Sequence, residues 1–170
     1  MKLETALLER KSIRKYTEKE IPTELLVQLL EFAKHAPTGR NNQGIQFYAL
    51  KNPYYIEEME EVLAKELKEP SYSLRGAKAF ILTLVHRDNK FSKQDTACAM
   101  MNIHYGAMAN GLGACWINQM SDHCDGPYLR AFLEKLDVPS DYVSYGMMAL
   151  GYPDEDPEPK ERVSKTRVIE

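Results

Sequence analysis

The feature that most constrains the fold is an almost unbroken apolar run at residues 79–85 (AFILTLV). A strand with one face in water alternates apolar and polar residues, whereas a continuously apolar strand needs cover on both faces. The run therefore predicts a central strand that lies between two layers of other elements.

The rest of the chain supplies elements for such a sandwich. A helix between 94 and 111 carries very little charge and is expected to be buried at the centre of the fold. Strands and helices alternate around one sheet, and no repeat or linker divides the chain, so we expect a single α+β sandwich domain over residues 1–170. The other helices are expected at 3–10, from 22 to before 37, at 54–67 and at 127–136, and the other strands at 45–50, 114–120 and 142–150.

Charge and cysteine content exclude several classes of protein. The net charge of −3 and the pI near 5.9 argue against a nucleic-acid partner. Cys98, Cys115 and Cys124 show no metal-ligand spacing, so we expect no metal and free thiols, with Cys98 and Cys115 buried. No apolar run approaches the roughly 20 residues that span a bilayer, and the start of the chain does not resemble a signal peptide. We expect a cytoplasmic protein that is not in a membrane.

Two polar segments suggest a small ligand. Residues 10–14 (RKSIR) place three cations and a hydroxyl in five positions, a set that suits a phosphate, and Lys160 and Arg162 form a second basic pair. Residues 37–43 (PTGRNNQ) offer amides and a hydroxyl to a polar ring. The same residues also fit a solvated helix end and an ordinary helix-to-strand turn.

Four segments resemble, in chain order, motifs of the FMN-dependent nitroreductase family. Residues 10–14 resemble its Arg-x-Ser-x-Arg/Lys segment, and residues 37–43 its Pro-Ser-Ser-x-Asn-x-Gln turn. Residues 111–117 (GLGACWI) resemble its Gly-Leu-Gly helix end and following strand, and residues 159–162 (PKER) its C-terminal Lys-x-Arg phosphate clamp. The resemblance covers nearly the whole chain, and the ordered set is more specific than any one motif.

This resemblance implies a nitroreductase-like α-β-α sandwich with a central mixed, mostly antiparallel sheet flanked by helices, in an intertwined homodimer. It implies FMN as the cofactor, with residues 153–170 as a C-terminal extension that reaches the cofactor and the partner subunit. Val168 and Ile169 are candidates to join the sheet edge of that partner. The weakly charged helix at 94–111 agrees with a homodimer, because a second copy would cover it.

The resemblance also implies roles for individual residues. Arg14 corresponds to a cation beside flavin N1 and O2, where it would stabilise the negative charge that reduction leaves and raise the reduction potential. The turn at 37–43 would reach the flavin of the partner subunit, and backbone groups near Gln119 and Met120 would approach N5. The implied cofactor-binding residues are Arg10, Lys11, Ser12, Arg14, Pro37, Thr38, Gly39, Asn41, Gln43, Gln119, Met120, Lys160 and Arg162, with Arg10, Ser12, Lys160 and Arg162 at the phosphate and ribityl chain.

The implied activity is ping-pong transfer from NADH or NADPH, through FMN, to a small electron-poor acceptor such as a nitroaromatic or a quinone. No side chain is expected to act as an acid or base. The chain departs from the family at residues 70–75 (PSYSLR), where Arg75 is the candidate contact to the pyrimidine ring, and at Arg40, an added positive charge that would favour an anionic substrate or the phosphates of NAD(P)H. A flavin-binding protein without turnover, such as a sensor or flavin store, and a dimeric structural protein with only surface charge both remain open.

Overall fold

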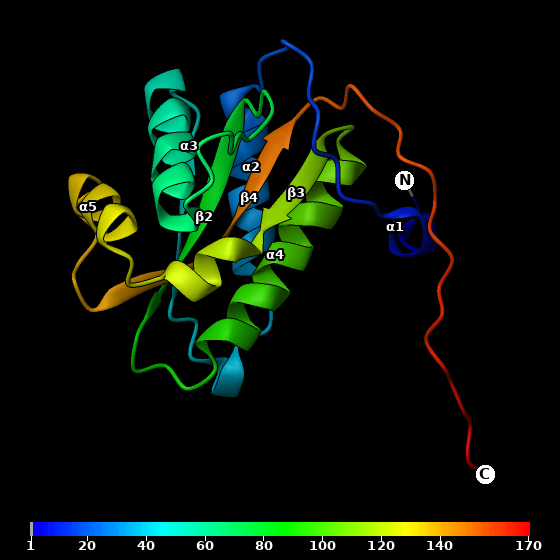
Figure 1. The fold of residues 1–170 in the computed structure, drawn as a ribbon. Helices are drawn as coiled ribbons and strands as arrows, with labels where there is room; N and C mark the ends of the chain where they lie inside the picture. The colour runs from blue at the N-terminus through cyan, green and yellow to red at the C-terminus, as the bar shows by residue number, and fades with distance from the viewer. Residues whose placement is uncertain (1) are drawn as a thin grey trace.

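The computed structural model describes residues 2–170, which form three layers: helices, one sheet, and helices again (Figure 1). The elements in chain order are α1 (Leu3–Glu9), α2 (Thr23–Lys34), η1 (Gly39–Asn41), β1 (Ile45–Leu50), α3 (Pro53–Leu67), β2 (Ala79–His86), α4 (Ser92–Ala109), β3 (Gly113–Ile117), η2 (Asn118–His123), α5 (Pro127–Lys135) and β4 (Tyr142–Gly151). Within this described part of the chain, no helix has the length and apolar content needed to cross a membrane.

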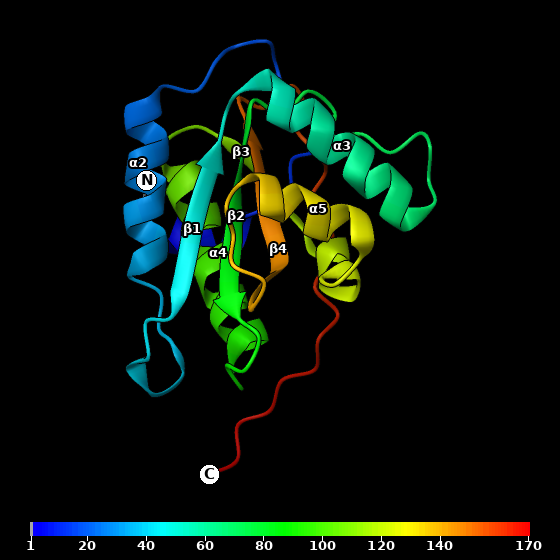
Figure 2. The same ribbon diagram turned by 90° about the vertical axis from the view of Figure 1, so that its left-hand side faces the viewer.

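The four strands lie in the order β1-β2-β4-β3, and all three neighbouring pairs are antiparallel. The predicted central strand is confirmed, because β2 pairs on both sides and is buried along all but its last residue. Helices α2 and α4 cover one face of the sheet and α3 and α5 cover the other, as Figure 2 shows. The predicted α-β-α sandwich and mostly antiparallel sheet are therefore confirmed.

Each face of the sheet has its own apolar core, because alternate residues of a strand point to opposite faces. Phe80, Leu82 and Leu84 of β2 belong to the core under α3 and α5, whereas Ala79 and Ile81 belong to the core under α2 and α4. Both cores therefore depend on the same strand.

The sequence of α4 allows it to approach the neighbouring helix α2 closely. A Cβ atom at Gly106 would lie 2.4 Å from a ring carbon of Phe32 in α2, so only glycine fits there. The predicted burial of this helix is confirmed for one face. Its other face, however, carries partly exposed Ala97, Cys98, Met101, Tyr105 and Met108, so the expectation that Cys98 is buried is wrong.

The predicted boundaries differ by one or two residues at several elements, and most at the end of β3. The strand expected at 114–120 ends at Ile117, and residues 118–123 form the 3-10 helix η2. Met120, which is fully buried, continues the apolar alternation past the end of the strand, so the pattern alone did not show where pairing stops.

The N-terminal segment between α1 and α2 is hydrogen-bonded to the end of the sheet where β3 begins and β4 ends. The backbone N–H of Ile13 donates to the carbonyl of Ala114, and that of Thr17 donates to the carbonyl of Tyr152. Two glycines allow this close approach: a Cβ atom at Gly113 would lie 2.6 Å from Ile13, and one at Gly151 would lie 2.7 Å from Tyr16. At this end of the sheet, residues 10–14 lie next to the start of the C-terminal extension (Figure 1).

Candidate functional site

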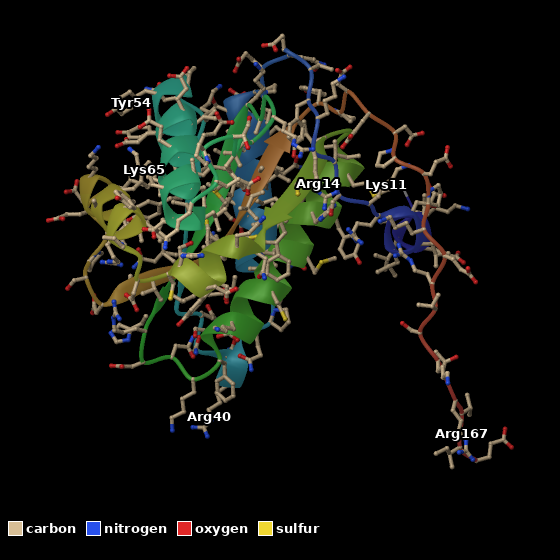
Figure 3. The ribbon with its side chains drawn as sticks, in the orientation of Figure 1. Lys11, Arg14, Arg40, Tyr54, Lys65 and Arg167 are labelled. Carbon is tan, nitrogen blue, oxygen red and sulfur yellow. The ribbon has the colours of Figure 1, made fainter. Side chains whose placement is uncertain are left out.

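A groove of about 730 Å³ lies between residues 8–14 and residues 156–162, which come from opposite ends of the chain. The cations that line it are Arg10, Lys11, Arg14, Lys160 and Arg162, together with the hydroxyl of Ser12. The structure thus brings the two predicted basic clusters together, because the C-terminal extension turns back past α1 (Figures 1 and 3).

The cations of this groove fall into two kinds. Lys11 forms an ion pair with Asp156 and donates to the carbonyl oxygen of Pro157 at 2.9 Å. Within residues 2–170, the side chains of the four remaining cations have neither a salt bridge nor a hydrogen bond, which leaves these side chains able to bind an anion. Those cations are Arg10, Arg14, Lys160 and Arg162.

Three successive acidic residues of the extension attach it to the N-terminal segment. Asp154 pairs with Lys15 at 3.0 Å, Glu155 accepts from the backbone N–H of Arg14, and Asp156 pairs with Lys11. The backbone N–H of Asp154 also donates to the carbonyl of Lys15 at 2.9 Å. These contacts carry the chain from the last strand to the cations at 160 and 162.

A buried histidine contacts the backbone of the N-terminal segment that lines the groove. The Nε2 atom of His104 in α4 lies 3.2 Å from the carbonyl oxygen of Lys11, and the side chain is only 4% exposed. Burial lowers the pKa of His104 to about 4, so the ring is neutral at pH 7 and can donate from Nε2. His104 is therefore a buried core residue whose polar ring has a hydrogen-bond partner.

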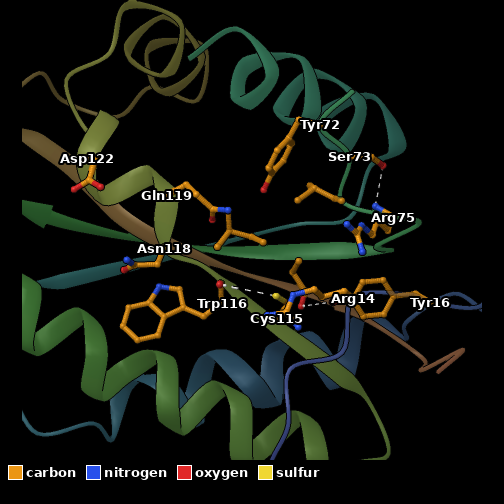
Figure 4. Close-up of a pocket in the computed structure, with 13 residues that line it drawn as sticks. Arg14, Tyr16, Tyr72, Ser73, Arg75, Cys115, Trp116, Asn118, Gln119 and Asp122 are labelled. Atoms are coloured by element: carbon orange, nitrogen blue, oxygen red, sulfur yellow. Dashed lines mark hydrogen bonds between the residues drawn. The ribbon is translucent and has the colours of Figure 1, made fainter. Parts of the chain in front are cut away.

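A second pocket, of about 390 Å³, adjoins the first and shares Arg14 with it. Figure 4 shows Arg14, Tyr16 and Cys115 together on one side of this pocket, with Tyr72 opposite and Asn118 and Gln119 from η2. The guanidinium groups of Arg14 and Arg75 are the cations in its lining. The pocket therefore combines apolar walls with positive charge and amides, a set that suits a flat polar ring.

Two side chains of this second pocket, Tyr72 and Cys115, are neutral near pH 7. Burial raises the pKa of Tyr72 to about 12, and it also raises the pKa of the Cys115 thiol. Neither group is therefore prepared to act as a nucleophile or a base. Met120 is fully buried and does not line this pocket, so the structure does not bring this predicted site residue to the pocket surface.

The turn at 37–43 lies elsewhere. Pro37, Thr38, Asn41 and Gln43 line a different groove, of about 800 Å³, together with residues of α2 and β1. This groove has no lining residue in common with the two pockets that share Arg14. Figure 3 shows Arg40 of the turn at the opposite end of the sheet from Arg14 and Lys11. One copy of the chain therefore does not bring the turn to the cationic groove.

Sequence reasoning missed several residues that shape these sites. Tyr72 and Cys115 line the second pocket, Asp156 holds Lys11, and Asp95 holds the turn at 37–43. Asp95 is the one acid of the weakly charged helix α4, but this signal does not identify its partner in the turn. The acidic run at 154–156 was visible in the sequence, but its pairing with Lys11 and Lys15 depends on how the two chain ends fold together.

The sequence is similar to a known protein family along most of its length. The sequence profile of the Nitroreductase family matches residues 7–83 and 74–152, which together are more than half of the chain. A Methanothermobacter thermautotrophicus protein, provisionally named NADH dehydrogenase/NAD(P)H nitroreductase, is 28% identical over 96% of this chain and 83% of its own length. The NADH dehydrogenase of Thermus thermophilus is 25% identical over 97% of this chain and 93% of its own length.

A solved structure agrees with the sequence comparisons. The nitroreductase of Bacteroides fragilis, crystallised with bound FMN, is 29% identical to this chain and superposes with a TM-score of 0.86. That superposition covers 100% of both chains. The similarity therefore includes both ends of the chain, where the cationic groove is built.

Proposed function

The chain belongs to the nitroreductase family, and on this premise we propose that it binds FMN and works as an oxidoreductase. In this proposal NADH or NADPH is the reductant, and a small electron-poor acceptor, such as a nitroaromatic or a quinone, is reduced in a second half-reaction. FMN supplies the hydride chemistry when bound, and the protein supplies binding, orientation and electrostatics.

The observation that carries the proposal is the position of Arg14, which lines both the cationic groove and the adjoining pocket. A phosphate needs several donors, and the groove offers two forked guanidinium groups, an ammonium and a hydroxyl from Arg10, Arg162, Lys160 and Ser12. A flat ring fits the adjoining pocket. The two joined sites therefore match a ligand with a phosphate at one end and a heterocycle at the other.

We assign a different role to Lys11. Its ammonium group already serves Asp156 and the carbonyl oxygen of Pro157, so it holds the extension in place and does not meet the phosphate. Arg10, Lys160 and Arg162 bind the phosphate, whereas Arg14 faces the part of the ring that becomes negative on reduction. Arg75, at the rim of the same pocket, is the second cation available to that ring.

We further propose that the working form is a homodimer with two shared sites. The half-exposed apolar face of α4, together with Leu3, Leu7 and Leu8 of α1, which are 54–72% exposed, needs a partner to cover it. The turn at 37–43 lies on a groove of its own, so it can serve only the site of a second copy. A two-fold arrangement would give each flavin the cations of one chain and the turn of the other.

An anaerobic titration tests this function. The purified protein is expected to be yellow and to lose its colour when NADH or NADPH is added, and an electron-poor acceptor should then restore the colour. A yellow protein that neither nucleotide bleaches would be a flavin-binding protein without turnover. A colourless protein that takes up no added FMN would contradict the proposal altogether.

A further inference from the structure

The turn at 37–43 holds an unusual backbone conformation. Arg40, Asn41 and Gln43 have φ angles of 56°, 54° and 50°, in the left-handed region that favours glycine. For residues other than glycine this region is unfavourable, and Arg40 lacks the tolerance for it that asparagine has. The conformation therefore persists only if the surrounding structure holds it.

Hydrogen bonds within the turn account for part of that support. The N–H of Asn41 donates to the carbonyl of Thr38 at 2.9 Å, and the N–H of Gln43 donates to the Thr38 hydroxyl at 3.0 Å. The amide of Gln43 also donates to the side-chain oxygen of Asn41 at 3.1 Å. These bonds shape the turn, but they do not attach it to the body of the protein.

The attachment comes from a buried carboxylate at the start of α4. Asp95 is 2% exposed, and its Oδ1 atom accepts the backbone N–H of Gly39 at 2.7 Å. No salt bridge reaches Asp95 from the described residues, so its charge is met by hydrogen bonds alone. A carboxylate buried in this way is costly, which argues for a role beyond packing.

Asn89 connects the same carboxylate to the other side of the turn. Its amide donates to Asp95 Oδ2 at 3.1 Å, and its Oδ1 atom accepts from the Asn42 amide at 3.3 Å and from the backbone N–H of Phe91 at 3.0 Å. Phe91 in turn lies against Gly39, where an added Cβ atom would come within 2.3 Å of the ring. The turn is therefore fixed at two points by one network.

We propose that Asp95 is a positioning residue that, directly and through Asn89, holds the turn at 37–43 in the strained conformation that meets the flavin of a second copy. This inference rests on the proposed function for its purpose, but the tether itself is a property of the flavin-free chain. Asp95 does not touch the ligand; it acts through Gly39 and Asn42.

The first test therefore uses flavin-free protein and trypsin. Trypsin cleaves after Arg40, inside the turn, and also after Arg167 in the exposed extension, which serves as the internal control. In Asp95→Asn, the new side-chain NH2 group faces the NH2 group of Asn89, so two donors meet and their hydrogen bond is lost. Loss of one buried hydrogen bond should speed cleavage after Arg40 roughly tenfold. Cleavage after Arg167 should stay constant.

A paired exchange separates positioning from general damage. In the double variant Asn89→Asp with Asp95→Asn, donor and acceptor are exchanged and every hydrogen bond of the network can form again, so resistance at Arg40 should return. Ile103→Val, in the core on the same helix, lowers stability without touching the turn and should leave cleavage at Arg40 unchanged. If Asp95→Asn does not fold, Asn89→Ala should give the same faster cleavage.

FMN affinity then links the tether to the site. Asp95→Asn should weaken FMN binding about tenfold, and the exchange variant should restore it. Unchanged cleavage at Arg40 and unchanged affinity in Asp95→Asn would overturn the inference. So would equal effects in Ile103→Val. If the parent protein itself binds no FMN, the proposed function fails, and the trypsin result still decides whether Asp95 holds the turn.

Discussion

The ammonium group of Lys11 pairs with the carboxylate of Asp156, and this contact joins two positions that lie 145 residues apart in the sequence. It is one of three successive contacts between the N-terminal segment and the C-terminal extension, with Glu155 on the backbone of Arg14 and Asp154 on Lys15. The groove proposed to bind phosphate exists only because these two segments lie together.

The role of Lys11 as a tether can be tested by exchanging charges. Lys11→Met and Asp156→Asn should each weaken FMN binding by up to about fivefold, since pairs this exposed contribute at most about 1 kcal/mol. The exchange Lys11→Asp with Asp156→Lys should restore affinity. A much larger loss in Lys11→Met than in Asp156→Asn, with no rescue, would mean that Lys11 contacts the phosphate directly.

The unpaired cations should matter more. Arg10→Ala and Arg162→Ala should each cost about 1.5–3 kcal/mol of FMN binding, the range for a hydrogen bond to a charged group. Arg167→Ala is the matched control, because Arg167 is an exposed cation of the same extension that does not line the groove. Affinities from flavin titration that are equal in all three variants would refute the phosphate assignment.

Arg14 is expected to tune the flavin more than to hold it. Loss of a cation beside the reduced ring should make reduction less favourable, so Arg14→Met should lower the two-electron midpoint potential by roughly 30 mV, equivalent to about 1.4 kcal/mol. It should also slow reduction by NAD(P)H. An unchanged potential in fully flavinated Arg14→Met, with a lowered one in Arg75→Met, would move this role to Arg75.

His104 predicts a pH dependence of stability. The unfolded chain binds a proton at this ring below about pH 6.5, whereas the folded chain does so only below about pH 4. The free energy of unfolding should therefore fall as the pH drops from 6.5 to 4, by up to about 3 kcal/mol. Denaturant unfolding should show a smaller dependence over this window in His104→Gln. Identical slopes in the two proteins would exclude His104 as the source.

Much of the fold could be predicted because its signals are local. The apolar run at 79–85 identified the central strand, and the low charge of 94–111 identified the helix beneath the site. The end of β3 could not be predicted, because Met120 is buried whether the backbone is extended or in a 3-10 turn. Apolar alternation reports burial and not hydrogen bonding.

The candidate site was predictable in its residue types but not in its connections. The basic clusters at 10–14 and 160–162 could be read directly, yet the pairing of Lys11 with Asp156 depends on how the chain ends fold together. The role of Asp95 was hidden for the same reason, since its partner Gly39 lies 56 residues away. Long-range partners of this kind leave no periodic signal in a single sequence.

The central claim is that the cations of one chain and the turn of another form a single flavin site, and mixing two defective chains tests it most directly. Arg10→Ala removes a groove cation and Asn41→Ala removes a turn amide, so each homodimer should bind FMN weakly. Refolding the two together should give heterodimers with one intact site each, and flavin bound at parental affinity to one of their two sites. Mixing that restores no tight binding, or FMN that travels with a monomer during size-exclusion chromatography, would contradict the claim.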